Sequence, residues 1–157
     1  SRDDDEVRSA CERVFALDCG VLPIQGPPGT GKTYTGAHMI LALLRAGKKV
    51  GVTAVSHEVI RNLLHGVCER AAESGWDDFK CLHKGDPKDG YSEAIHAIND
   101  NERVAQLFGA GGYDLLGGTA WLWARPDLRR AADVLFIDEA GQMSLADVLA
   151  VSGSAAM

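Results

Sequence analysis

The sequence predicts an α/β fold: a three-layer sandwich in which a mainly parallel sheet lies between two layers of helices. Short apolar runs alternate with longer segments whose apolar residues recur at helical spacing. Such alternation is typical of parallel sheets that are covered on both faces. The chain has 157 residues, of which 46% are hydrophobic, so it can bury the core of one ordinary domain.

The first third of the chain predicts a helix, a strand and a second helix. Residues 3–18 carry apolar side chains at helical spacing, and Gly20 ends that pattern. The apolar run 21–25 predicts a short buried strand. A helix is expected to begin near Lys32, with Gly47 as its C-terminal cap.

The middle of the chain predicts two further strands and two further helices. Residues 50–54 form the second strand, and Ser56 is placed to cap the helix that follows. A third strand is expected over 79–82, followed by a polar surface loop over 83–92 that contains glycine and proline. We expect a helix near 93–108.

The last third predicts a strand over 113–116 and a helix over 144–151. Between them, residues 134–137 are a continuous apolar run and the strongest central-strand signal in the chain.

Composition restricts the class of function. The net charge is −6, which argues against a protein that grips nucleic acid with its whole surface. No segment approaches the roughly 20 apolar residues of a membrane span, and no secretion leader is visible. The cysteines are Cys11, Cys19, Cys68 and Cys81, and none forms a Cys-x-x-Cys pair. They predict reduced thiols in a cytoplasmic protein.

A glycine-rich segment matches the phosphate-loop spacing G-x-x-x-x-G-K-[ST] in full, and it lies between a predicted strand and a predicted helix. Glycines let the backbone N–H groups approach phosphate oxygens closely. Lys32 is expected to reach the β- and γ-phosphates of a nucleoside triphosphate, and the Thr33 hydroxyl to hold Mg²⁺. The segment consists of Gly26, Pro27, Pro28, Gly29, Thr30, Gly31, Lys32 and Thr33.

Two carboxylates follow the strongest strand. In open α/β sheets the chemistry gathers beyond the carboxyl ends of the strands, so Asp138 and Glu139 are expected to lie beside the phosphate loop. Asp138 would hold Mg²⁺. Glu139 would orient and deprotonate the attacking water. The alternative, a solvated acidic turn, is weakened by the complete phosphate loop upstream.

Four segments, in this order, resemble motifs I, Ia, Ic and II of superfamily 1 helicases in the branch that moves 5′ to 3′. They are 26–33, 53–57, 118–120 and 138–142. The run 138–144 is similar to that of helicases fused to RecB-like nucleases.

The resemblance implies a RecA-like P-loop NTPase fold and ATP as the nucleotide. It implies that Thr53, Ser56 and Thr119, or amides near them, contact the phosphate backbone of a single strand of DNA or RNA. It also implies that Gln142 senses the γ-phosphate. The implied partners are the single strand, a second RecA-like domain and a fused RecB-like nuclease domain.

Two positions depart from the family. His57 and Glu58 stand where the family often has Asn and a basic residue, and an acid there opposes a phosphate backbone. Trp121 and Trp123 follow motif Ic. They are candidates for stacking on bases or for ordinary packing.

The resemblance also predicts the domain organisation. We expect one RecA-like motor domain over 1–157, with an N-terminal helix in 1–19 and the P-loop NTPase core in 20–157. The chain begins with Ser1 and stops at Met157 without a clear domain end, so we expect a piece of a longer helicase. In the family a second domain supplies arginine fingers. The isolated piece is therefore expected to bind nucleotide but hydrolyse it slowly.

Other classes of function remain open. The same phosphate-loop sequence occurs in AAA+-type ATPases that remodel proteins, but 138–142 and the strand ends at Thr53 and Thr119 favour a helicase. The sequence does not choose between DNA and RNA. A GTPase is disfavoured because there is no Asn-Lys-x-Asp signature.

Overall fold

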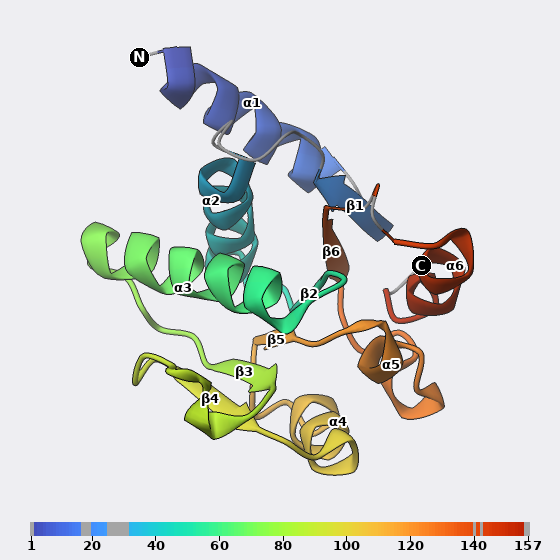
Figure 1. Cartoon of the computed structure of the whole chain (residues 1–157). Coiled ribbons are helices and arrows are strands. Elements are labelled where there is room, and N and C mark those ends of the chain that lie inside the picture. Colours follow the sequence, from blue (N-terminus) through green and yellow to red (C-terminus); the bar gives the residue numbers. More distant parts are fainter. Residues whose placement is uncertain (1, 17–19, 25–31, 140, 142, 156–157) are drawn as a thin grey trace.

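Six parallel strands form one sheet in the order β1-β6-β2-β5-β3-β4 (Figure 1). The last strand in sequence, β6, lies between β1 and β2, so segments far apart in the chain pair at the centre of the sheet. The strands are β1 (Gly20–Ile24), β2 (Val50–Thr53), β3 (Cys81–Lys84), β4 (Ile95–Ile98), β5 (Leu115–Gly117) and β6 (Val134–Asp138).

The computed structural model describes residues 2–16, 20–24, 32–139, 141 and 143–155, and the side chains of 4–13, 33–139, 141 and 143–155. Short 3₁₀ helices at Pro87–Asp89 and Pro126–Leu128 lie in loops. The α-helices in the described ranges are α1 (Arg2–Ala16), α2 (Lys32–Arg45), α3 (His57–Ser74), α4 (Asn101–Gly109), α5 (Ala120–Trp123) and α6 (Leu145–Ser152).

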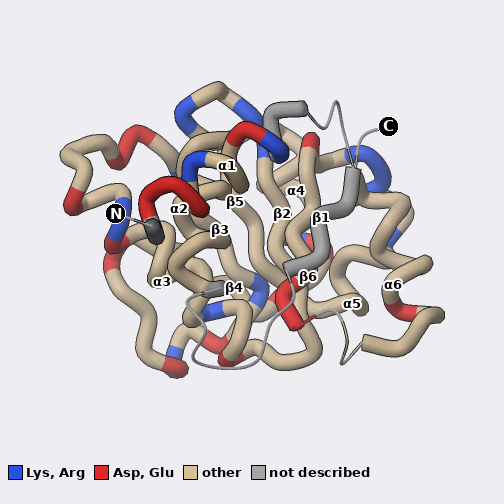
Figure 2. The backbone as a smooth tube through the Cα atoms, turned by 90° about the horizontal axis from the view of Figure 1, so that it is seen from above, with Lys and Arg blue, Asp and Glu red and all other residues tan. Residues whose placement is uncertain are grey.

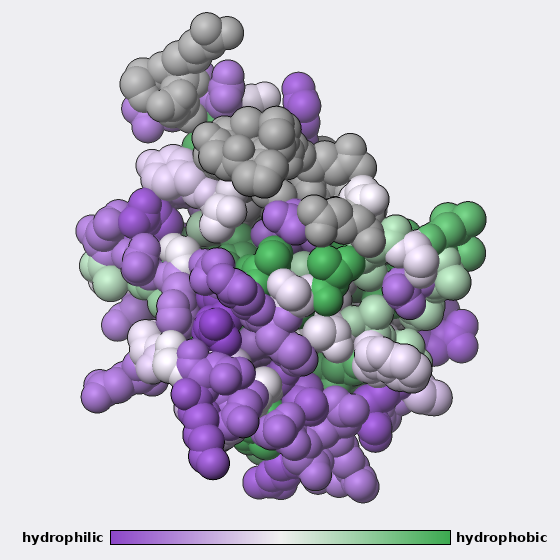
Figure 3. Space-filling model, in the orientation of Figure 1, coloured by the Kyte–Doolittle hydropathy of each residue, from purple (hydrophilic) through white to green (hydrophobic). Residues whose placement is uncertain are grey.

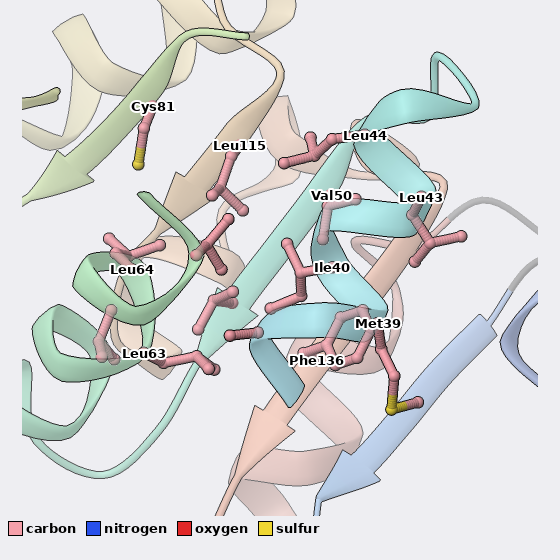
Figure 4. Packing of buried hydrophobic residues seen from close by; sticks show 14 of the residues in the cluster. Met39, Ile40, Leu43, Leu44, Val50, Leu63, Leu64, Cys81, Leu115 and Phe136 are labelled. Carbon is pink, nitrogen blue, oxygen red and sulfur yellow. The ribbon is translucent and has the colours of Figure 1, made fainter. Parts of the chain in front are cut away.

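The helices form two layers, one on each face of the sheet. Helices α1, α2 and α3 pack on the first face. Figure 4 shows apolar side chains of α2 and α3 gathered with those of β2 and β6. Helices α4, α5 and α6 pack on the second face. Side chains alternate along β6, so Val134 and Phe136 join the first core while Leu135 and Ile137 join the second. The predicted α/β sandwich is confirmed, and its sheet is parallel.

A glycine in β2 allows close packing of α5 on the second face. A Cβ atom at Gly51 would lie 2.6 Å from Cη2 of Trp123 and 2.8 Å from Cδ1 of Leu135. The Trp123 indole N–H donates to the carbonyl oxygen of Val52 at 3.0 Å. The ring therefore lies against the β2 backbone, where a larger side chain at Gly51 would collide with it.

The predicted caps of two helices are confirmed. Ser56 precedes α3 with extended backbone, and its Oγ accepts from the Val59 N–H at 3.2 Å. Gly47 follows α2 with a φ of +78°, and its N–H donates to the Leu44 carbonyl oxygen at 3.0 Å. Few side chains tolerate that backbone conformation, which explains glycine at this helix end.

The predicted helix over 93–108 is wrong in its first half. Residues Ile95–Ile98 form the edge strand β4, and α4 begins only at Asn101. Ile95 is buried and pairs with Cys81 of β3, so sheet burial overrides local helical spacing. Asp100 then starts α4 by accepting from the Arg103 N–H at 2.7 Å.

Two further differences concern short elements. The third strand begins at Cys81, two residues later than the expected 79–82, and extends to Lys84 inside the predicted loop. The four-residue helix α5 was not predicted. Its apolar residues are too few for helical periodicity to show in the sequence.

Charged residues of both signs are distributed over the described part of the chain (Figure 2). Figure 2 shows Lys and Arg mingled with Asp and Glu around the sheet in the described part of the chain. No helix among the described residues is long and apolar enough to cross a membrane.

Candidate nucleotide-binding site

The carboxyl ends of the strands collect the predicted site residues at one edge of the sheet. Because all six strands run in the same direction, their carboxyl ends share that edge. Asp138 ends β6 and Thr53 ends β2, and the two strands are hydrogen-bonded neighbours with Thr53 opposite Ile137. Thr119 follows β5, the next strand along. Thr53 and Asp138, which are 85 residues apart in the sequence, thus meet at one edge.

The phosphate loop has the structural context that its motif requires. Strand β1 ends at Ile24 and α2 begins at Lys32, so the segment between them joins a strand to a helix N-terminus. Ile24, the last described residue of β1, pairs with Asp138 at the acidic end of β6. The predictions for Gly26, Pro27, Pro28, Gly29, Thr30 and Gly31, and for the Lys32 side chain, fall outside the described residues and remain predictions.

Asp138 occupies a buried position on the same side of the sheet as α2. Its side chain is 3% exposed. Since Val134 and Phe136 face α2 and α3, alternation directs Asp138, two residues further on, toward that layer. Thr33 lies in the first turn of α2 and is exposed.

These two side chains fit a magnesium site. A hydroxyl and a carboxylate are hard oxygen ligands, and Mg²⁺ in nucleotide sites takes one or two carboxylates together with phosphate oxygens. No group of three or more His, Cys, Asp or Glu among the described residues could hold a metal ion. A Mg²⁺ ion between Thr33 and Asp138 would complete its coordination with oxygens of a bound nucleotide.

Glu139 has an unusual backbone. Its φ is +53°, one of two positive values among the described non-glycine residues. This left-handed conformation costs about 1–2 kcal/mol for an ordinary side chain. The chain thus turns sharply after β6, and Glu139 is half-buried where Asp138 is buried. Gln142, the expected γ-phosphate sensor, lies outside the described residues.

The three candidate strand contacts have different surroundings. Thr53 is fully buried, and its Oγ1 has no hydrogen-bond partner among the described residues. Its side chain is therefore not displayed at the surface. Ser56 is half-buried, with its Oγ engaged in the α3 cap. Thr119 is half-buried at the start of α5 and makes no side-chain cap bond there.

Thr119 lines a hollow of about 300 Å³ between the end of β2, α5 and α6. Val55, Trp121 and Met143 contribute apolar surface to it, and Asp147 contributes a carboxylate. The two tryptophans after the third motif differ: Trp121 is 86% exposed, whereas Trp123 is buried and hydrogen-bonded to β2. Figure 3 shows apolar surface over α6, which carries the exposed residues Leu145 and Leu149.

A histidine cluster at the end of β3 was not anticipated. His83 is fully buried, its Nδ1 lies 2.7 Å from the Tyr91 hydroxyl, and its ring centroid is 5.6 Å from that of His57. Burial, followed by the positive charges of His57, Arg61, Lys84 and His65, lowers the pKa of His83 from 6.5 to about 3. The imidazole is therefore neutral at physiological pH.

The same cluster gathers cationic groups beside the α3 N-terminus. Burial lowers the pKa of His57, and the charges of Lys84 and Arg61 lower it further while Asp89 opposes them. Arg61 forms an ion pair with Asp89 at 3.8 Å. His65 and His83 have no shared spacing in the sequence, so they are expected to be ordinary surface or core residues. The sequence feature that could have indicated this cluster is His83-Lys84, two polar residues at the end of the β3 segment.

A second hollow, of about 360 Å³, lies between α2 and α3. It begins at Thr33 and Tyr34 and extends to His65 and Arg70. The Arg70 guanidinium lies 5.4 Å from the Tyr34 ring centroid and bonds to Glu73 at 2.9 Å. The helix that carries the phosphate-loop threonine thus borders an open polar groove.

Comparison with known proteins assigns the chain to a family. No curated protein matches the chain. A family model described as an AAA domain matches residues 4–157. This family is a P-loop NTPase domain found in superfamily 1 helicase-like proteins, and it implies binding and hydrolysis of a nucleoside triphosphate. The matched residues include the phosphate loop and the Asp138–Glu139 pair, and the chain therefore belongs to the AAA domain family and is a P-loop NTPase domain.

Proposed function

We propose that the chain is the first motor domain of a DNA helicase, in which ATP hydrolysis drives movement along a single strand. The adjacency of β6 and β2 is the observation that carries the proposal. Neighbouring parallel strands lie about 4.8 Å apart. A strand contact at the end of β2 would therefore be one strand away from Asp138 and Glu139. Strand binding and hydrolysis could be coupled over that distance.

The proposed chemistry divides among few residues. Backbone amides of 26–31 and the Lys32 ammonium bind the phosphates, and Thr33 and Asp138 hold Mg²⁺. The metal would neutralise charge on the β- and γ-phosphates. Glu139 orients a water and accepts its proton on a carboxylate oxygen as the water attacks the γ-phosphorus. Gln142 contacts the γ-phosphate and links its hydrolysis to contact with the nucleic acid strand.

The proposed strand contacts lie along the edge formed by β2 and β5. Ser56 and Thr119 are partly accessible there. Because the Thr53 side chain is buried, we assign the contact at Thr53 to backbone amides near it. Contacts of this kind are independent of base sequence and weaken with salt.

The wider setting of the proposal follows from the helicase resemblance. It comprises the 5′-to-3′ branch, a second RecA-like domain that closes the ATP cleft and a fused RecB-like nuclease. A cytoplasmic location is proposed from the cysteines, which are expected to be reduced. An arginine from the second domain would raise turnover by about 10³–10⁵-fold, as in other phosphoryl-transfer enzymes.

The test is stimulation of ATP turnover by the protein that contains this chain together with its second motor domain. Single-stranded DNA, single-stranded RNA and an unfolded protein are added in separate arms at low salt. A rise with single-stranded DNA supports the proposal, and a rise with RNA alone identifies an RNA helicase. A rise with unfolded protein alone favours an AAA+-type remodelling ATPase. If neither single-stranded DNA nor single-stranded RNA stimulates ATP turnover, the helicase function is refuted.

A further inference from the structure

Two cysteines contact each other between α3 and β3. Cys81 begins β3 and is almost fully buried in the core under α3. Cys68 lies on α3 one helical turn after the buried Leu64, so both share the face that packs on the sheet. Cys68 packs against the core cluster that contains Cys81, and the two thiols are within reach of each other. Figure 4 shows the Cys81 sulfur directed toward α3.

The surroundings give the two thiols different reactivity. Its hydrogen bond with Cys81 lowers the pKa of Cys68, against opposing effects of burial and Glu69. Burial is the main reason that the pKa of Cys81 is raised. Cys68 is half-buried, whereas Cys81 is inaccessible. Cys68 is thus the thiol that a small reagent meets first, and its thiolate is the nucleophilic form.

Cys11 offers a comparison within the same chain. It is half-buried on α1, on the same side of the sheet, and burial raises its pKa. It resembles Cys68 in exposure but differs in its environment. Cys19 lies outside the described residues.

We propose that Cys68 and Cys81 form a redox modification site at which a hydroperoxide produces a reversible disulfide between α3 and β3. The Cys68 thiolate attacks the terminal peroxide oxygen, an S–O bond forms, and the O–O bond breaks. The departing oxygen takes a proton and leaves as an alcohol, or as water from hydrogen peroxide. Cys68 is then a sulfenic acid.

Cys81 completes the reaction. Its sulfur attacks the Cys68 sulfur as its proton passes to the departing hydroxyl, an S–S bond forms, and water leaves. Two thiols have lost two electrons, and the peroxide has gained them. A dithiol reductant reverses the step by thiol–disulfide exchange.

The cross-link would act on the stability of the fold. It closes the segment 69–80, which includes the end of α3, and so restricts the unfolded chain. The oxidised protein is therefore expected to unfold at a higher temperature than the reduced protein. This inference is independent of the proposed helicase function.

The test uses the whole chain under native conditions. The reduced protein is treated with a graded series of hydrogen peroxide, quenched with an alkylating reagent, digested without reductant and mapped by mass spectrometry. We expect the Cys68–Cys81 linkage to exceed every other cysteine linkage, to disappear with dithiothreitol, and to raise the thermal midpoint while present. The proposal is overturned if Cys68 stays reduced at a peroxide concentration that oxidises Cys11, or if Cys68 links mainly to Cys11 or Cys19.

Single substitutions separate the two roles. Cys81→Ser should stop the reaction at Cys68 sulfenic acid, which a dimedone probe captures. Cys68→Ser should leave Cys81 reduced, and Cys11→Ser should form the linkage as the unchanged protein does. Circular dichroism checks that each variant is folded. If a variant does not fold, the linkage map of the unchanged protein still decides whether Cys68 and Cys81 form the disulfide. Capture of the dimedone probe at Cys68 in the unchanged protein but not in Cys81→Ser would contradict the order of steps.

Discussion

At the scale of single residues, one strand end provides two neighbouring carboxylates with different surroundings. Asp138 completes β6 in regular strand geometry and is buried toward the α2 layer. Glu139 leaves the strand with a φ of +53° and is less buried. Strained backbone that persists in a fold often marks a functional position. This difference matches the two proposed roles, in which Asp138 binds Mg²⁺ and Glu139 accepts the proton of the attacking water.

Glu139→Gln is expected to preserve ATP binding and to reduce turnover. The amide keeps the size of the side chain but cannot accept a proton from water, and a general base contributes about 10²–10⁴-fold. Binding is measured with a fluorescent ATP analogue, and turnover by phosphate release. Glu93→Gln, at an exposed loop position, is the matched control. Unchanged turnover in Glu139→Gln would show that another group is the base.

His83 is expected to make stability depend on pH. Its pKa is about 3 in the folded protein against an ordinary 6.5, so the unfolded chain binds the proton first as pH falls. The contribution of neutral His83 to the free energy of unfolding is therefore complete above pH 6.5, and it declines as the pH falls from 6.5 toward about 3. In urea denaturation, His83→Gln should flatten this part of the pH profile.

The control for that profile is His96→Gln, at an exposed position of β4. Burial also lowers the pKa of His57 and His38, so part of the slope should remain in His83→Gln. Equal slopes for His83→Gln and the unchanged protein would contradict the assignment.

At the scale of elements, packing across the sheet explains choices that local propensity does not. β2 contains a glycine although glycine weakens a strand interior. The reason lies in α5, whose Trp123 occupies the space over Gly51 and bonds to the neighbouring Val52 carbonyl. A short helix with little stability of its own is thus held by the buried side chains of Leu122 and Trp123. Its position keeps Thr119 at the sheet edge.

Gly51→Ala is expected to destabilise the fold by about 1–3 kcal/mol, the usual cost of overpacking. The added methyl would collide with the Trp123 ring and Leu135. Urea denaturation measures the loss, and Gly109→Ala serves as the control because a Cβ there meets nothing within 4 Å. Equal stability of the Gly51→Ala and unchanged proteins would show that Trp123 moves aside at little cost.

Ser56→Ala is expected to remove the α3 cap and to cost about 1 kcal/mol of stability. Ser56→Asp keeps an acceptor for the Val59 N–H and should retain most of that stability. The pair also tests the proposed strand contact, because Asp preserves the cap but repels a phosphate. Weaker binding of single-stranded DNA by Ser56→Asp supports the contact, whereas unchanged binding by both variants argues that Ser56 is only a cap.

At the scale of the whole molecule, strand order decides which segments meet. The insertion of β6 between β1 and β2 puts the acidic strand end beside both the end of β1 and the end of β2. Charge contributes little on this scale, since the net charge is −6 and both signs are mingled around the sheet (Figure 2). Any contact with a nucleic acid backbone must therefore come from a local group of residues.

Residues 1–157 alone are expected to bind ATP but to hydrolyse it slowly and to leave a duplex intact. In the proposed function the second wall of the ATP cleft and its arginine come from another domain, whose arginine would be worth about 10³–10⁵-fold in turnover. Equilibrium binding, phosphate release and a fluorescent duplex-separation assay measure the three properties. Efficient strand separation by this chain alone would refute the expectation.

Local pattern was enough to predict most elements of the fold and to identify a phosphate-loop motif in the sequence. Phosphate loops and acid-terminated strands are contiguous motifs, so 26–33 and 134–139 can be interpreted without knowing the fold. The caps at Ser56 and Gly47 are also local and were predicted correctly. The failures occurred where distant pairing outweighs local preference, as at β4, which forms a strand because Ile95 is buried beside β3.

By itself, the sequence determined that this chain is an α/β protein with a phosphate loop and an acidic strand end. Tertiary structure alone decided that β6 separates β1 from β2, that Trp123 is buried while Trp121 is exposed, and that Cys68 meets Cys81. The physical reason is that motifs and periodicity depend on neighbours in the chain. Strand order and side-chain burial depend on the packing of the whole core, where residues far apart in sequence compete for the same space.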